Sequence, residues 1–399
     1  MEAWRSCSED GISQGMNVLR DHWRSTVAVI WFVTVLLIRF TFFPYSNGDM
    51  QGFNLIWYRT LATEGVLDTL GTNFANYTPP YTYLVALATL TKGFFAPLTA
   101  LKLIPTCFDI LNAWIVFHIT RIRYPHGSIP LLAATVFFSA PTVMLNSSYW
   151  GQADSLYATF LLLCLYFALR QRPMATIICF GLAFTVKAQA AFLFPFLLIM
   201  IPHTRRFWIS LLIIPAVYLA AVLPTVLLGR PLKDVLFIYV EQARTFRELS
   251  MNAPNLYAFI PNGWYDLAYP ICMILALIII ALWVRSRKGS CLTIDHETIV
   301  LYAATSALMV PFLLPKMHDR YFYPAEVLAI VLIFFRPSLW YIPILLQAAS
   351  IMAYSRFLFK SDLLWLWVAA IQNTVTLGLL FWGQQQEKRI PRAGAAQQI

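Results

Sequence analysis

Charged side chains are scarce in this sequence. They make up 12% of its 399 residues, about half the share that is typical of soluble proteins. Hydrophobic residues make up 59%, and no long polar stretch interrupts the apolar runs. This composition leaves no room for a sizeable soluble domain. It predicts an all-α, polytopic membrane protein, because helices satisfy their own backbone hydrogen bonds in lipid.

Several sequence motifs of soluble enzymes are also missing. No Walker motif, GxGxxG, HExxH or GxSxG occurs, so neither a nucleotide pocket nor a zinc-protease site nor a nucleophile elbow is predicted. The six cysteines show no CxxC or other metal spacing, and most lie inside apolar runs. We interpret them as small buried hydrophobes. The sequence predicts no cofactor and no metal site, while dependence on a divalent metal stays open.

Acidic residues are fewer than basic ones, 19 against 29. No nucleic-acid readout motif accompanies the excess, so nucleic acid is not an expected partner. We assign the basic residues to short cytoplasmic loops, which set the orientation of a membrane protein. The excess also favours anionic membrane lipids as partners. The loops contain Arg121/Arg123, Arg170/Arg172, Arg205/Arg206, Arg285/Arg287/Lys288 and Lys388/Arg389/Arg392.

The apolar runs divide the chain into two modules. A cytoplasmic segment, 1–26, precedes a first module at 27–202 with an outer loop at 45–100. A second module at 203–384, with an outer loop at 229–263, precedes a tail at 385–399. Because a span needs about 20 residues, we expect about a dozen transmembrane helices. They are placed near 27–44, 101–120, 129–147, 155–169, 174–187, 188–202, 207–228, 264–284, 298–315, 322–335, 338–355 and 361–383.

Two assignments decide which side each loop faces. The stretch 79–98 begins with Pro79-Pro80 and contains Lys92, so we expect it to lie at the membrane surface or to dip into it. The stretch 174–202 is predicted to make two short crossings, broken near Lys187. A single tilted helix is the alternative, but it would invert the rest of the chain and place Arg285 and Arg287 outside, against the positive-inside rule.

The compact polar clusters then share the outer side. They are Gly48-Asp49, the run from Trp150 to Asp154, and the run from Lys316 to Tyr321. A charged carboxylate near the hydrocarbon of a membrane is costly, so it is found where it has a charged partner, faces a water-filled cavity or serves a function. The clusters therefore predict an active site at the boundary between membrane and water.

Asp49 has two interpretations from the sequence. It opens a mixed segment, Met50 to Leu61, with Phe53, Ile56, Trp57 and Leu61 spaced as one face of an interfacial amphipathic helix. It could therefore be an ordinary N-cap. Its place among the outer polar clusters favours a functional carboxylate.

The second and third clusters have alternatives too. Trp150 suits an interfacial anchor and Asp154 a helix cap, whereas Gln152 and Asp154 together suit hydrogen bonds to a sugar. Tyr81 belongs to an aromatic belt or orients an acceptor through its hydroxyl. His318 and Arg320 offer donors for a phosphate, or form a snorkelling rim at a helix end.

Three further residues complete the predicted site. Lys187 lies inside an apolar run, where an unpaired ammonium is costly unless a helix break opens onto a cavity. Asn252 and Asn255 bracket a proline turn in the outer loop and are expected to face that cavity. Asp295-His296-Glu297 lies on the other side, and we interpret it as a helix cap with a solvated face.

Taken in order, these motifs resemble the glycosyltransferase C (GT-C) superfamily. Gly48-Asp49 is similar to its acidic motif after the first helix, and Tyr77 to Thr82 to a segment of its dolichyl-phosphate-glucose-dependent glucosyltransferases and of GPI mannosyltransferase I. The stretch from Ala140 to Ser155, Lys187-Ala188-Gln189 and His318-Asp319-Arg320 resemble later motifs. The likeness is best over about the first 200 residues and looser to 325. The short loop between Asp49 and Pro79 departs from the family, so the sugar, acceptor and linkage stay open.

The resemblance implies an inverting glycosyltransferase that moves a hexose, such as mannose, from a polyprenyl-phosphate carrier to a glycan or glycolipid acceptor. Asp49 would be the general base. Arg320, His318 and Lys187 would bind the donor phosphate, and no metal would be required. Sugar and acceptor would contact Gln152, Asp154, Tyr81, Asn252, Asn255 and Trp150. The expected location is a bacterial inner membrane with the site facing the periplasm, or the endoplasmic reticulum in a eukaryote.

Two other functions remain open from the sequence. A transporter or flippase for a lipid-linked sugar would bind with the same polar groups without reacting, but it should show a polar path through the membrane and inverted repeats. The concentration of polar residues on one side favours the enzyme. A structural subunit of a glycan-assembly complex would tolerate the loss of Asp49.

Overall fold

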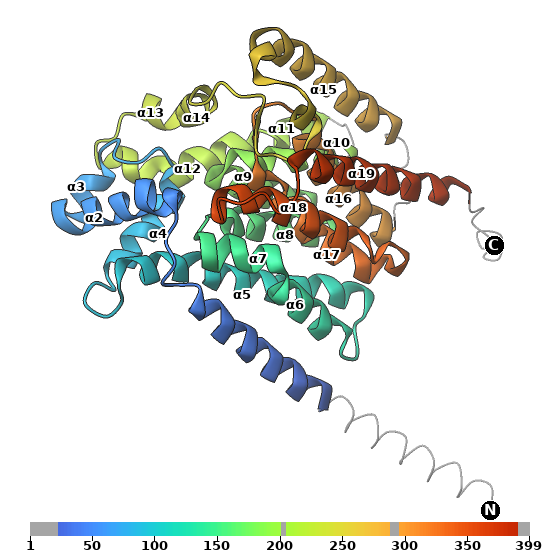
Figure 1. Ribbon diagram of the computed structural model, residues 1–399, viewed down its shortest axis with the longest axis horizontal. Helices are drawn as coiled ribbons and strands as arrows, with labels where there is room; N and C mark the ends of the chain where they lie inside the picture. The colour runs from blue at the N-terminus through green and yellow to red at the C-terminus, as the bar shows by residue number, and fades with distance from the viewer. Residues whose placement is uncertain (1–22, 201–204, 288–294, 390–399) are drawn as a thin grey trace, which may run out of the picture.

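The computed structural model describes residues 23–200, 205–287 and 295–389, and almost all of its regular structure is helical (Figure 1). The prediction of an all-α protein is therefore confirmed. Residues 1–22 of the predicted cytoplasmic segment 1–26, and residues 390–399 of the predicted tail 385–399, lie outside the described residues. Strands β1 (Ser250–Met251) and β2 (Met317–His318) form one short parallel pair.

The elements follow one another along the chain in three groups. A helix at Trp23–Thr41 precedes η1 (Met50–Asn54), α2 (Leu55–Glu64), α3 (Val66–Leu70) and α4 (Pro79–Thr89). The middle group comprises α5 (Pro97–Arg123), α6 (Ile129–Ser139), α7 (Pro141–Met144), η2 (Leu145–Trp150), α8 (Asp154–Leu169), α9 (Pro173–Val186), η3 (Ala188–Leu193) and α10 (Phe194–Met200). The last group comprises α11 (Arg205–Ser210), α12 (Ile213–Leu227), α13 (Leu232–Leu236), α14 (Ile238–Arg244), η4 (Leu256–Phe259), η5 (Asn262–Trp264), α15 (Tyr265–Arg287), α16 (His296–Leu313), η7 (Asp319–Phe322), α17 (Tyr323–Phe335), η8 (Pro337–Leu339), α18 (Ile342–Leu358) and α19 (Leu366–Arg389).

Six of the described helices are long and apolar enough to cross a membrane, or seven if a pair bent by 52° counts as one span. The six are Trp23–Thr41, Pro97–Arg123, Trp208–Leu227, Asn262–Arg287, His296–Leu313 and Leu366–Gln386. Several of the other predicted spans are shorter. Helices α8, α9, α17 and α18 have 16, 14, 13 and 17 residues, which at 1.5 Å per residue gives about 20–25 Å, below the roughly 30 Å of the hydrocarbon core. The structure supports a polytopic membrane protein and does not confirm a dozen spans.

The structure shows a helix break near Lys187 and a short helix within 79–98, the two features on which the predicted loop orientation depends. Helix α9 ends at Val186, and Lys187 is extended with φ −156° and ψ 135° before η3 begins. The predicted helix break is therefore present. Helix α4 has only 11 residues, too few to span a bilayer, as expected for a helix that does not cross.

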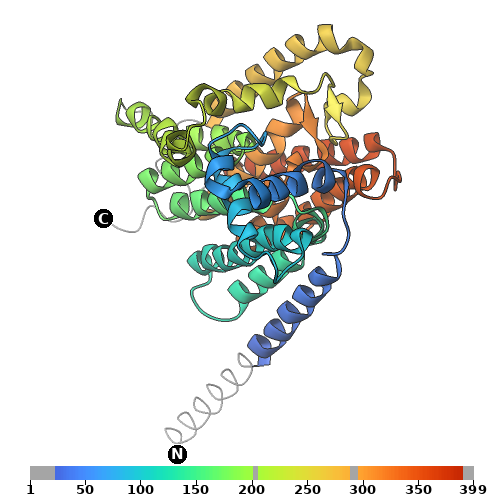
Figure 2. The ribbon, with the colours of Figure 1, turned by 90° about the vertical axis from the view of Figure 1, so that its left-hand side faces the viewer.

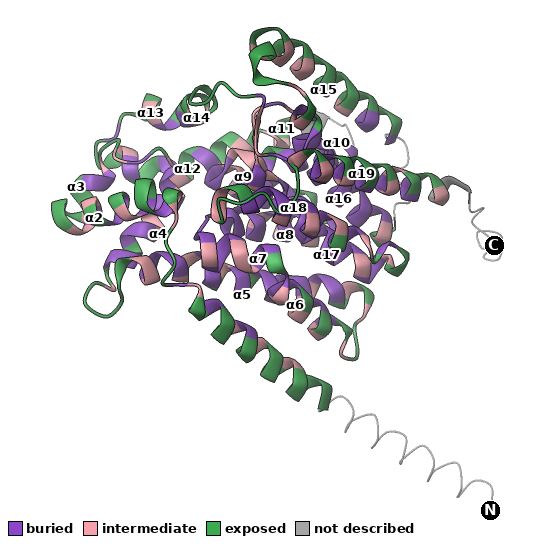
Figure 3. Cartoon of the chain, viewed as in Figure 1, coloured by how far each residue is buried: buried purple, intermediate pink, exposed green. Residues whose placement is uncertain are grey.

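Burial separates a central bundle from outer helices (Figure 3). In α16, 89% of the apolar window is buried, whereas the corresponding value for the α15 segment is 17%. The first helix is mostly exposed as well, and it projects from the bundle in both ribbon views (Figures 1 and 2). Apolar side chains exposed in this way suit contact with lipid.

Ion pairs identify one end of the bundle. Glu297, at the start of α16, lies 3.6 Å from Arg123 at the end of α5 and 3.3 Å from Arg336 after α17. Asp295 accepts a hydrogen bond from the Thr298 amide at 2.7 Å, so its predicted role as a helix cap is confirmed. Arg123 belongs to one of the loops predicted to be cytoplasmic. The opposite ends of α16 and α17 flank the segment from Leu314 to Phe322, which contains the third outer cluster.

Candidate functional site

The Asp49 carboxylate is held by two side chains from the turn after η2. Its Oδ2 atom accepts hydrogen bonds from Trp150 Nε1 at 3.0 Å and from Gln152 Nε2 at 2.7 Å. The side chain is 24% exposed. Asp49 makes no side-chain cap to η1, and its own backbone is helical, with φ −65° and ψ −40°. The N-cap interpretation is therefore wrong, because the carboxylate faces the second polar cluster instead of the helix start.

The expected apolar face after Asp49 is only partly correct. Trp57 and Leu61 are buried, but Phe53 and Ile56 are exposed. The reason is local: Met50–Asn54 is a π-helix, which holds more residues per turn than the α-helix assumed in the spacing.

The linker that carries Asp49 is fixed by hydrogen bonds on both sides. Asn47 donates from Nδ2 to the Trp150 carbonyl at 2.9 Å and accepts at Oδ1 from the Met50 amide at 3.1 Å. Lys102, fully buried in α5, donates from Nζ to the Phe42 carbonyl at 2.9 Å and to the Tyr45 carbonyl at 2.6 Å. Backbone and side-chain contacts thus set the position of the carboxylate.

Gly151 allows the turn to approach this linker. Its φ of +78° lies in the left-handed region, which favours glycine. A Cβ atom here would lie 2.2 Å from Met50 Cε and 3.4 Å from Lys102 Cγ. The positive φ therefore requires the glycine, while the nearest atom to an added Cβ is the flexible end of the Met50 side chain.

Arg320 brings a cation to the same carboxylate. Its Nη1 atom lies 3.5 Å from Asp49 Oδ2 and 4.0 Å from Asp319 Oδ1, and its guanidinium lies 5.3 Å from the Trp150 ring centroid. The side chain is 15% exposed. Its Nε atom is buried and has no hydrogen-bond partner among the described residues. We call Asp49, Trp150, Gln152 and Arg320 the carboxylate–guanidinium cluster.

The neighbours of Arg320 have shifted pKa values. Burial raises the pKa of Asp319 to about 7, although the Arg320 cation opposes the shift. Burial, together with the nearby Arg320 and Lys187 cations, lowers the pKa of His318 to about 2. Near pH 7, His318 is therefore a neutral imidazole, which can donate one hydrogen bond but brings no charge to an anion.

Lys187 and Asp154 contact one another. Lys187 Nζ forms an ion pair with Asp154 Oδ1, and Asn146 Nδ2 donates to Asp154 Oδ2 at 2.9 Å. Asp154 is fully buried and makes no cap at the start of α8. The structure thus pairs a residue predicted to bind phosphate with one predicted to bind sugar. The pair neutralises the lysine at the helix break.

The two asparagines of the outer loop differ in their surroundings. Asn252, with φ +58°, bridges to His318 beside the β1–β2 pair, so its loop is joined to the His318 segment. Asn255 is fully buried, and its Nδ2 atom lies 3.4 Å from the Pro311 carbonyl and 3.3 Å from the Leu314 carbonyl. Asn255 therefore braces the end of α16 and is not open to a ligand.

Tyr81 is also closed off. It is 1% exposed, and its ring packs 5.0 Å from Tyr77 and 6.4 Å from Trp57, measured between centroids.

Of the residues predicted to form the site, the structure brings Asp49, Trp150, Gln152 and Arg320 into direct contact. His318 and Asn252 lie on the segments next to them.

One buried ion pair was not predicted from the sequence. Arg39 Nη1 lies 2.7 Å from Asp109 Oδ2, both side chains are fully buried, and Ser147 Oγ accepts from the same Nη1 at 2.9 Å. The Tyr323 hydroxyl donates to Asp109 Oδ1 at 3.4 Å. Both charges lie within predicted spans, where the cost of an ionisable group in lipid is a signal that could have identified them. The pair joins the end of the first helix to α5.

In the part of the chain that the structure describes, no three His, Cys, Asp or Glu side chains are grouped so that they could hold a metal ion. Neither a protein-family model nor a curated protein matches this chain. The geometry of the carboxylate–guanidinium cluster is the basis for the function proposed below.

Proposed function

We propose that this protein is an inverting glycosyltransferase of the GT-C type. It takes a hexose from a polyprenyl-phosphate carrier and transfers it to a glycan or glycolipid acceptor. The observation that supports this most directly is a sheltered but open carboxylate, Asp49, held 3.5 Å from the guanidinium of Arg320. A transfer from a lipid phosphate needs a base for the acceptor hydroxyl and a cation for the departing phosphate, and this cluster supplies both.

Asp49 suits the role of general base because its hydrogen bonds fall on one oxygen. Within the described residues, Trp150, Gln152 and Arg320 all contact Oδ2. Oδ1 is left to take the proton of an acceptor hydroxyl. A base must reach that proton directly, and the 24% exposure of the side chain permits this.

The proposed reaction balances without a further reactant. The acceptor oxygen forms a bond to the anomeric carbon while its proton passes to Asp49. The bond from that carbon to the phosphate oxygen breaks, and its electron pair stays on the phosphate. Attack opposite the leaving group inverts the anomeric centre. Arg320 stabilises the departing phosphate with its fixed donors, and His318 can add a neutral one.

The membrane fold suits a lipid-linked donor. The cluster lies at the end of a bundle surrounded by exposed apolar helices, so a long prenyl chain could stay in lipid while its phosphate meets Arg320. We place the site on the periplasmic face of a bacterial inner membrane, or on the lumenal face of the endoplasmic reticulum. Three roles change from the sequence prediction: the Asp154–Lys187 pair supports the helix break, Asn255 supports α16, and Tyr81 packs against Tyr77 and Trp57.

A transfer assay tests the proposal. Purified protein in lipid nanodiscs is incubated with a panel of polyprenyl-phosphate sugars, radiolabelled in the sugar, and with membrane glycolipid extracts as acceptors. We expect labelled product with one of the donors, and no product when Asp49→Asn protein is used. Donor binding without transfer by the wild type would contradict the proposal and favour the transporter or flippase.

A further inference from the structure

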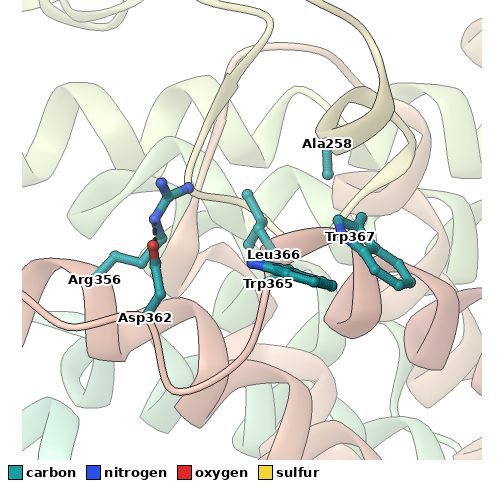
Figure 4. Close-up of a pocket in the computed structure, with 6 residues that line it drawn as sticks. All are labelled: Ala258, Arg356, Asp362, Trp365, Leu366 and Trp367. Carbon is teal, nitrogen blue, oxygen red and sulfur yellow. Dashed lines mark ion pairs between the residues drawn. The ribbon is translucent and has the colours of Figure 1, made fainter.

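An open cleft lies at the connection between α18 and α19. A cavity of about 360 Å³ is lined by Ala258, Arg356, Asp362, Trp365, Leu366 and Trp367 (Figure 4). Its volume falls within the range of about 300–1,000 Å³ that is usual for small-molecule sites. None of the six residues belongs to the carboxylate–guanidinium cluster.

Two tryptophans form one side of this cavity. Trp365 and Trp367 are 67% and 42% exposed, and their rings lie 5.5 Å apart with an angle of 28° between their planes. Figure 4 shows both on the same side of the cavity. The face of an indole ring carries negative charge density, so it attracts the weakly positive C–H groups on the face of a sugar ring.

The other side of the cavity carries an ion pair. Arg356 Nε lies 2.6 Å from Asp362 Oδ1, and the two side chains are 41% and 47% exposed. The guanidinium supplies several donors and the carboxylate only acceptors, which together match the hydroxyls of a saccharide. Because the two charges cancel, this cavity is better suited to a neutral polyol than to a phosphate.

The cavity is joined to the carboxylate–guanidinium cluster through α18. Phe357 follows Arg356, and the Trp150 ring stacks on Phe357 with centroids 4.9 Å apart and planes 19° apart. The same Trp150 donates to Asp49. A ligand in the cavity would therefore lie against the helix end that supports the proposed base.

The outer loop forms the third wall. Ala258 belongs to η4, and the loop before it is joined to α19 by a hydrogen bond from Asn373 Nδ2 to the Pro254 carbonyl at 2.9 Å. Ser250 and Met251 of the same loop pair with Met317 and His318. One loop thus borders both the cavity and the segment that carries Arg320.

We infer that the cavity is a saccharide subsite, with Trp365 and Trp367 stacking on a neutral sugar ring and Arg356 and Asp362 binding its hydroxyls. This inference rests on the proposed function, under which the sugar would belong to the acceptor. Tryptophans near the start of a span also serve as interfacial anchors. An experiment must therefore separate binding of a sugar from contact with lipid.

Saturation-transfer NMR measures sugar binding without any transfer reaction. The full chain is placed in lipid nanodiscs free of glucoside and maltoside detergents, and a panel of methyl hexopyranosides is added without a donor. We expect saturation of ring C–H protons for at least one glycoside. Trp365→Ala/Trp367→Ala protein should lose this signal by about tenfold or more, and Arg356→Gln should weaken it. Trp340→Ala is the matched control, since Trp340 is also exposed, at 62%, but follows η8 at the other end of α17.

The outcomes separate this inference from the proposed function. Asp49→Asn protein should bind the glycoside like the wild type even though its transfer is lost. If no glycoside binds to the wild type, or if binding survives the double tryptophan variant, the subsite is wrong whatever the transfer assay shows. Quenching of Trp365 and Trp367 by brominated lipids without any glycoside signal would identify them as membrane anchors and overturn the inference.

Discussion

The Arg320 guanidinium lies 3.5 Å from the Asp49 carboxylate, although 271 positions separate the two residues in the chain. This distance exceeds the roughly 2.7–2.9 Å of a tight charge-assisted hydrogen bond. Arg320 is therefore not fully occupied by Asp49, and a phosphate could compete for its donors. Asp49 in turn is positioned by Trp150 and Gln152, so it would keep its place when the arginine binds a ligand.

Asp49→Asn tests the base. The amide can still accept hydrogen bonds from Trp150 and Gln152, so the fold and donor binding should persist, while turnover falls by at least ~10²-fold, the usual scale for a general base. The measurement is labelled-sugar transfer by purified protein with a matched melting temperature. Asp266→Asn, at an exposed carboxylate, is the control and should transfer normally. Near-normal transfer by folded Asp49→Asn protein would show that Asp49 is not the general base.

Arg320→Ala tests the phosphate site. We expect donor affinity to fall by about tenfold to a hundredfold, as for lost hydrogen bonds to a charged group. Arg320→Lys should recover only part of it, because an ammonium lacks the planar fork of donors. The measurement is binding of a polyprenyl-phosphate sugar, with exposed Arg285→Ala as control. Unchanged affinity in Arg320→Ala protein would contradict the phosphate role and show that Arg320 is only a snorkelling cation at a helix end.

Local signals in the sequence predicted several residues that the structure brings together in the candidate site. Asp49, Gln152 and Arg320 stand out because polar groups at helix ends near lipid are costly unless they have a partner or a function. The structure brings the three side chains into contact. The break at Lys187 was also predicted, from the cost of an unpaired ammonium. The sequence could not show that Asp154 is the counter-charge of Lys187, since any of several carboxylates could have paired with the lysine.

The count of spans was less predictable for a physical reason. Hydropathy marks apolar residues, but helix length depends on where each helix ends. Helix α17 begins after the short η7 turn and ends before Arg336, so it has 13 residues. The span predicted at 322–335 was itself only 14 residues long, below the roughly 20 that a crossing needs. Likewise, the π-helix at Met50–Asn54 changes which side chains share a face, and nothing in the apolar spacing indicated it.

Lys102→Met tests how the base is positioned. The variant keeps an apolar stem but loses the hydrogen bonds to the Phe42 and Tyr45 carbonyls, so the linker before Asp49 should loosen. We expect kcat to fall about tenfold or more, because small displacements of a catalytic group are costly, while donor affinity stays unchanged. Steady-state transfer kinetics measure the split. Lys92→Met, at an exposed lysine, is the control, and an equal loss of donor affinity would contradict a positioning role.

Cysteine labelling tests the orientation. Lys360 lies in the exposed connection after α18, near the site, and His126 lies in the exposed turn after α5. In a cysteine-free background, Lys360→Cys should react with an impermeant thiol reagent in intact cells, whereas His126→Cys should react only after lysis. The opposite pattern would invert the topology and place the site in the cytoplasm.

Asp319 gives a pH dependence whose sign follows from its raised pKa. Its pKa is about 7 in the folded protein against an ordinary value of 3.8, because burial disfavours the charged carboxylate. Between about pH 4 and pH 7 the folded state therefore holds a proton that the unfolded chain has lost. Stability must then fall as the pH rises through this window, since it rises with pH only where the unfolded state binds more protons.

Asp319→Asn should remove this effect, because the amide resembles the protonated acid. We expect the variant and the wild type to melt at similar temperatures at pH 5. At pH 8 the variant should be the more stable, by an amount on the order of 2 kcal/mol. Thermal unfolding in nanodiscs across this range measures the difference, and Asp266→Asn, which alters an exposed carboxylate, should follow the wild type. If Asp319→Asn shows the same pH profile as the wild type, Asp319 is already ionised in the folded protein, and it acts as a permanent counter-charge for Arg320.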